Sequence, residues 1–126
     1  MGTGMFSAQQ PAQGRRWPRG QRFTLSAPGI EAEAAYRAAV MDVRSLGRDA
    51  LTQAEKRWAE PLGLAPSDGI VMAEIRPGRR SLSDVSKALE PCGTPAAQVR
   101  ESIDRLVEKG LVEPLPAQGA PPPHAP

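Results

Sequence analysis

The sequence predicts a mainly α-helical protein, with one domain of about five helices, a short strand near its carboxyl end and an extended tail on either side. Three observations favour this fold class. The 14 prolines and 12 glycines concentrate at the two ends, which leaves one domain of about 80 to 90 residues between them. Apolar residues between the ends recur at intervals of three and four, the spacing of one helix face. Aromatic residues make up only 4% of the chain, so the core has to be built from aliphatic side chains.

Composition excludes several classes of protein. No segment approaches the ~20 apolar residues that cross a bilayer, and residues 1–21 lack the apolar run of a signal peptide. The single cysteine, Cys92, forms no internal disulfide and fits a reducing compartment. The only histidine, His124, lies in the carboxyl-terminal tail, away from any zinc-ligand spacing. We therefore expect a cytoplasmic protein with no membrane contact, metal or cofactor.

Catalytic chemistry has little support in the sequence. General acid-base and nucleophilic catalysis need several reactive groups that converge. His124 lies among prolines and Cys92 lies in a turn, so we expect no enzyme. Cys92 has two interpretations, a redox-sensing thiol ahead of a helix or a small turn residue, and the second is the more common.

The formal net charge of +2 is unevenly distributed. Residues 1–22 contain Arg15, Arg16, Arg19 and Arg22 and none of the 14 acidic residues. The remainder of the chain therefore has a small excess of acidic groups. Because residues 1–22 are rich in Gly, Pro and Gln and lack helical or strand periodicity, we expect a disordered, arginine-containing arm.

A single domain is expected over residues 23–115. Its first residues, "RFTLS", form either a short strand or an extended lead-in. Residues 30–62 hold two leading helices, because "IEAEAAYRAAVMDVRSL" consists of strong helix formers and Gly47 separates it from "LTQAEKRWAEPL". In the second helix, Thr52 and Glu55 have capping-box spacing. The expected apolar face of the first helix comprises Ala32, Tyr36, Ala39, Val40, Val43 and Leu46.

The carboxyl-terminal half of the domain contains three further expected helices. "APSDGIVMAEI" forms the first, and "RPGRR" breaks it. Ser81 and Asp84 have the spacing of a capping box at the start of a helix that runs to Leu89. Thr94 and Pro95 begin the last helix as N-cap and first helical residue. The apolar stripe of this helix is Val99, Ile103, Leu106 and Val107.

A short strand follows the last helix at "LVEPL". Residues 116–126 are rich in proline and are expected to form a disordered tail. Because proline removes a donor from a strand ladder, these residues argue against a second paired strand.

The order of these elements, with "RRSLSDVSKAL", a turn and a helix that ends in "IDRLVEKGLVEP", resembles a winged helix-turn-helix domain of the broad type found in MarR-like and ArsR-like regulators. The resemblance covers about residues 64–115. It implies a helix-turn-helix bundle with a β wing, which is truncated here, and the function of a DNA-binding transcriptional regulator. It also implies that the helix over residues 94–109 enters the major groove of double-stranded DNA. The groove-facing residues would be Thr94, Ala96, Ala97, Gln98 and Glu101, with Arg100 and Arg105 also exposed.

Two arginine clusters are candidates for contact with DNA phosphates. Each also has a simpler interpretation, a solvated turn for the cluster in "RPGRR" and a solubilising tail for the cluster in the arm. Trp17 has no core to pack into if the arm is disordered, which favours contact with a partner. The candidate phosphate contacts are Arg76, Arg79 and Arg80 in "RPGRR" and Arg15, Arg16 and Arg19 in the arm.

A second hypothesis is a protein-interaction module that has the winged-helix fold but does not bind DNA. Arg100, Arg105 and Lys109 are matched along the last helix by acidic residues, so intrahelical ion pairs are sufficient to explain them. The truncated wing also lacks cations, because no Lys or Arg follows Lys109. The partner is therefore either double-stranded DNA or a protein. The leading helices, over residues 30–62, offer an apolar stripe for packing on the module itself or for a homodimer, which we favour.

Overall fold

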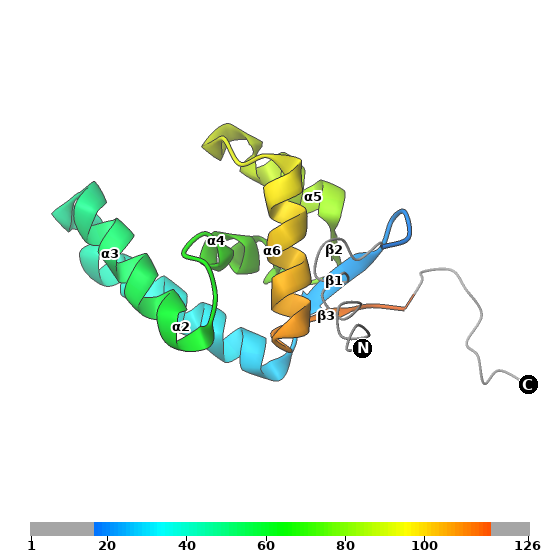
Figure 1. Cartoon of the computed structure of the whole chain (residues 1–126), viewed down its shortest axis with the longest axis horizontal. Coiled ribbons are helices and arrows are strands. Elements are labelled where there is room, and N and C mark those ends of the chain that lie inside the picture. Colours follow the sequence, from blue (N-terminus) through cyan, green and yellow to red (C-terminus); the bar gives the residue numbers. More distant parts are fainter. Residues whose placement is uncertain (1–16, 117–126) are drawn as a thin grey trace, which may run out of the picture.

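The computed structural model describes residues 17–116, and the expectations for residues 1–16, with Arg15 and Arg16, and for residues 117–126 lie outside the described residues. Within residues 17–116 the chain forms five α-helices and a three-stranded antiparallel sheet (Figure 1). This confirms the helix-rich fold class in its coarse form. The elements are β1 (Arg22–Leu25), α2 (Ala27–Val43), α3 (Arg48–Ala59), α4 (Asp68–Ile75), β2 (Arg80–Ser81), α5 (Leu82–Leu89), α6 (Ala96–Glu108) and β3 (Val112–Pro114).

The sheet is completed by the strand nearest the amino terminus. β1 is its central strand, in the order β2-β1-β3. Phe23 lies opposite Arg80 on β2 and Pro114 on β3, and Leu25 lies opposite Val112. Phe23 and Leu25 are both buried, as the two-residue period of a strand requires. "RFTLS" therefore contains a strand, and the strand near the carboxyl end pairs with it rather than with a following strand.

The first long helix, α2, begins at Ala27, earlier than the expected Ile30, because Ser26 caps it. The Ser26 hydroxyl accepts a hydrogen bond from the Gly29 amide at 3.1 Å. The same hydroxyl donates to the Gly110 carbonyl at 2.6 Å. One serine thus starts α2 and ties it to the chain that leaves α6.

The other end of α2 departs from the expected face. The α-helix ends at Val43, and a 3-10 turn over Arg44–Leu46 follows. Gly47, with a φ of 106°, then reverses the chain so that α3 starts at the next residue. Leu46 is 68% exposed, so it does not pack on the core as Tyr36 of the same expected face does. The tighter turn rotates its side chain off the stripe of the α-helix.

The capping box at the start of α5 is confirmed. The Ser81 hydroxyl accepts from the Asp84 amide, and the Asp84 carboxylate accepts from the Ser81 amide, both at 3.0 Å. The amides of Ser81 and Asp84, which have no carbonyl partner within the helix, are both hydrogen-bonded by this reciprocal pair. Ser81 also ends β2 in an extended conformation, so the strand passes directly into the helix.

Two other expected helix starts are wrong. α3 begins at Arg48, before Thr52, and has no side-chain cap. α6 begins at Ala96, with Pro95 rather than Thr94 as its N-cap residue. The Thr94 amide donates to the Leu89 carbonyl at 3.3 Å, so Thr94 belongs to the turn that closes α5.

The hydrophobic core joins the sheet to α4, α5 and α6. Beside this body, α2 and α3 lie antiparallel as a helical hairpin (Figure 1). Tyr36 of α2 and Trp58 of α3 meet edge to face, with ring centroids 5.1 Å apart. Gly69 of α4 packs against the Tyr36 ring so closely that a Cβ atom would overlap it. Large buried side chains of the core include Phe23, Met72, Ile75, Leu89, Ile103 and Leu106.

Candidate nucleic-acid interface

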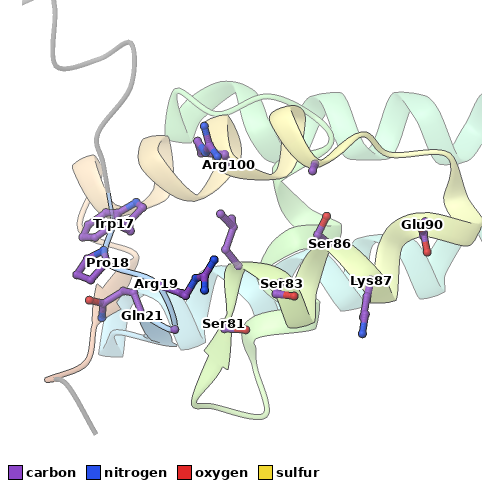
Figure 2. A pocket seen from close by; sticks show the side chains of 13 residues that line it. Trp17, Pro18, Arg19, Gln21, Ser81, Ser83, Ser86, Lys87, Glu90 and Arg100 are labelled. Atoms are coloured by element: carbon purple, nitrogen blue, oxygen red, sulfur yellow. The ribbon is translucent and has the colours of Figure 1, made fainter.

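A pocket of about 410 Å³ lies between α5, the first turns of α6 and the segment from Trp17 to Gln21 (Figure 2). Three cationic side chains line it: Arg19 from the amino-terminal segment, Lys87 from α5 and Arg100 from α6. Among the described residues that line the pocket, Glu90 is the only acidic one. The pocket therefore has an excess of positive charge although the domain as a whole does not.

The α5 wall of the pocket is set by the capping box. Because the helix starts at Leu82, the side chains of Ser83, Ser86 and Lys87 fall on one face, at helical spacings of three and four. The hydrogen bond from the Ser81 amide holds the pKa of Asp84 below its usual range. Asp84 thus stays ionised and committed to the cap at neutral pH.

The amino-terminal wall is anchored by Trp17. Its indole Nε1 donates to Asp104 Oδ1 of α6 at 2.9 Å, and its ring meets Phe23 edge to face at 5.1 Å. The expectation that Trp17 has no core to pack into is therefore wrong. Gln21 Nε2 adds a hydrogen bond of 2.7 Å to the Leu115 carbonyl. Arg19 lies between these two anchors and is held beside the pocket.

A second pocket of about 330 Å³ continues the positive surface toward β2. Arg19, Arg22 and Arg79 line it. The Arg22 guanidinium donates to the Arg79 carbonyl at 2.7 Å and lies 3.5 Å from the Asp84 carboxylate. This contact supports Arg79 in a left-handed conformation, with a φ of 54°, that few residues other than glycine adopt.

Arg19 lines both pockets, which joins them into one surface. We call Arg19, Arg79, Lys87 and Arg100 the basic face. All four are exposed, and none of them forms an ion pair with another residue of the described range 17–116. Of these four, Arg19, Arg79 and Arg100 were expected from the sequence to contact DNA, and the structure brings them together.

Three other arginines that the sequence assigned to DNA contact form internal ion pairs. Arg76 Nε lies 3.6 Å from Glu33, and Arg80 lies 3.2 Å from Glu74. Arg105 Nε lies 2.8 Å from Asp68, and this hydrogen bond raises the pKa of Arg105. These guanidinium groups hold the fold together, which leaves them less available to phosphates than the basic face.

Two other expected groove residues, Thr94 and Gln98, differ in accessibility. Thr94 is half-buried in the turn before α6, whereas Gln98 is exposed on its first turn. Gln98 Nε2 lies 3.4 Å from the Ser67 hydroxyl, a long contact that leaves the amide able to reorient.

Sequence reasoning missed Ser83, Ser86 and Lys87. Their spacing places them on the α5 face that does not include the core residues Val85 and Leu89, so the helical period was a usable signal. The helical period does not predict which segment lies beside that face, because the amino-terminal segment is placed there by the pairing of β1 and by the contact of Trp17 with Asp104.

Other parts of the described chain offer less defined chemistry. No group of three or more His, Cys, Asp or Glu in residues 17–116 could hold a metal ion, and no helix in that range is long and apolar enough to cross a membrane. Cys92 is an exposed thiol at the end of a 3-10 turn. Ile30 and Met41 expose apolar side chains on α2, by 57% and 59%.

Comparison with family models, curated proteins and solved structures finds no match to this chain.

Proposed function

We propose that this chain is a small DNA-binding protein of winged-helix type, a regulator of transcription that contacts duplex phosphates through the basic face. The observation that carries the proposal is the gathering of Arg19, Arg79, Lys87 and Arg100 around two adjoining pockets, all without an ion-pair partner among residues 17–116. Unpaired cations that share one surface are the main source of affinity for a polyanion, because each phosphate they neutralise releases a counterion.

The order and geometry of α5 and α6 support this proposal. α5 and α6 are consecutive, joined by a 3-10 turn over Glu90–Cys92, and the two helices form opposite walls of the pocket (Figure 2). In helix-turn-helix proteins the amino-terminal part of the second helix meets the base edges. Here that part carries Gln98, whose amide suits base edges, beside Arg100 of the basic face.

Charge along α6 favours entry by its amino-terminal end. The first turns carry Arg100, one acidic residue, Glu101, and the positive end of the helix dipole. Asp104 and Glu108 follow in the second half, where they would repel phosphates. DNA in this arrangement contacts the beginning of α6 and the basic face and leaves the end of α6 outside the groove.

The amino-terminal segment supplies what a truncated wing lacks. β3 carries no cation, and its partner in the sheet is β1. The turn that precedes β1 presents Arg19, and the turn before β2 presents Arg79. We infer that these two turns take the place of a wing and hold the DNA backbone beside α6.

A salt titration with matched variants tests the proposal. The triple variant R19A/K87A/R100A removes three cations of the basic face. The control R48A/K56A/R57A removes three exposed cations of α3, which form no ion pair with other described residues. Binding of a fluorescent duplex is followed by anisotropy between about 50 and 200 mM salt.

The two variants are expected to differ in slope as well as affinity. The logarithm of the binding constant falls with the logarithm of the salt concentration. Each lost phosphate contact reduces the steepness of this fall by about 0.9, so loss of three contacts reduces it by about 2.7. The α3 control should retain the wild-type slope. Absence of duplex binding at the lowest salt, or equal losses in both triple variants, would contradict the proposal and favour a protein-docking module.

A further inference from the structure

We infer that the pocket between α5 and α6 also binds a free, small organic phosphate of about nucleotide size. The pocket volume of about 410 Å³ falls in the range of about 300 to 1,000 Å³ that is usual for small-molecule sites. It is a concave site with walls from three separate segments of the chain, whereas a surface that contacts only backbone phosphates needs no such depth.

The lining combines two kinds of chemistry. Leu82, Ala96 and Pro18 provide apolar surface for the body of a ligand. Arg19 and Arg100 provide charged donors for its phosphate. A ligand that satisfies both has a compact apolar or aromatic body joined to a phosphate group.

The directions of the side chains agree with this division. Figure 2 shows Arg19 reaching from the amino-terminal segment toward the middle of the pocket, with Arg100 on the opposite helix. The Ser86 hydroxyl points into the space between α5 and α6, whereas Lys87 points outward. Arg19 and Ser86 are therefore the polar groups that point toward a ligand inside, Arg100 lines the pocket from α6, and Lys87 is placed for contacts outside.

Duplex DNA does not fill such a pocket. Its bases remain paired and stacked, so a duplex offers phosphates to the rim and no apolar body to Leu82. A free organic phosphate would use Arg19 and Arg100, which are also backbone contacts in the proposed DNA complex. The ligand would therefore compete with DNA, and this consequence rests on the proposed function.

Calorimetric titration with three probes tests the site without DNA. Adenosine 5′-monophosphate contains both parts, adenosine only the apolar body and inorganic phosphate only the anion. We expect the nucleotide to bind at least about tenfold more tightly than either part. R100A should weaken nucleotide binding by about tenfold, whereas R57A on α3 should leave it unchanged. Equal affinity for nucleotide and for either part, or equal effects of R100A and R57A, would overturn the inference.

A second variant separates pocket filling from charge. S86F places a bulky ring in the pocket and leaves the net charge unchanged, and A96F does the same from the α6 wall. Each should abolish nucleotide binding, and normal nucleotide binding by both folded variants would overturn the inference. Nucleotide binding without duplex binding would support the pocket and contradict the proposed function. Duplex binding without nucleotide binding would do the reverse.

Discussion

Asp68 shows how one buried carboxylate holds two helices together. It is fully buried at the start of α4 and accepts hydrogen bonds from the Ala65 amide at 2.9 Å and from the Ser102 hydroxyl of α6 at 2.6 Å. Arg105 adds two further hydrogen bonds, at 2.8 and 3.0 Å. The charge is thus compensated by the segment before α4 and by α6, and the same contact withdraws Arg105 from the solvent that DNA would occupy.

Replacement of Asp68 with alanine should strongly destabilise the fold. The variant removes the hydrogen-bond acceptor for Ser102 and leaves Arg105 half-buried without its counter-ion. Loss of one partner of such a pair costs about 3 to 5 kcal/mol in free energy of unfolding, measured by urea denaturation. As a control, Glu101→Ala on the exposed face of α6 should change it by less than about 0.5 kcal/mol. Equal stability of the two variants would show that Asp68 does not join the helices.

Trp17→Phe tests the anchor of the amino-terminal segment. Phenylalanine keeps a ring against Phe23 but cannot donate to Asp104. The free energy of unfolding should fall by about 0.5 to 1.5 kcal/mol. Asp104→Ala should give a similar loss, and the double variant should lose less than the sum of the two single variants. Strictly additive losses would mean that the indole and the carboxylate do not interact.

At the scale of elements, local sequence determines a helix start only where the surrounding backbone agrees with it. Ser81 caps α5 because β2 delivers it in an extended conformation, as a capping box requires. Thr94 has the right side chain, but its amide closes the preceding turn, so the N-cap moves to Pro95. The strand β1 is equally context-dependent. Four residues with alternating burial become a strand only because β2 and β3, distant in sequence, pair with them.

The capping box gives α5 a pH-dependent stability. The folded-state pKa of Asp84 is lowered, chiefly by the hydrogen bond from the Ser81 amide. Because the pKa is lower in the folded state, ionised Asp84 stabilises the fold when the pH is above its unfolded-state pKa of about 3.9. This stabilisation is lost as the pH falls through the folded-state pKa. Asp84→Asn should therefore be less stable than the wild type at neutral pH, and the difference should shrink below about pH 4. Urea denaturation over a pH series measures it, and a difference independent of pH would contradict the assignment.

At the scale of the whole molecule, the sequence predicted which segments form helices better than it predicted which segments lie beside one another. The helical period located α2 to α6, and composition located the arginine clusters. The proximity of Arg19 to Arg100 could not be predicted, because it depends on β1 entering the sheet and on Trp17 reaching Asp104 across the fold. For the same reason Arg105 looked like a groove residue, since its helical position reveals exposure on an isolated helix but not the carboxylate of α4 that faces it.

In the proposed complex, DNA lies across α5, the start of α6 and the amino-terminal segment. Chemical-shift mapping tests it most directly, by titrating isotope-labelled protein with duplex DNA at low salt and following backbone amides. We expect the largest changes in residues 17–22, 79–87 and 94–101, with smaller changes in α2 and α3. Changes centred on α2 and α3, or no changes at any DNA concentration, would contradict it.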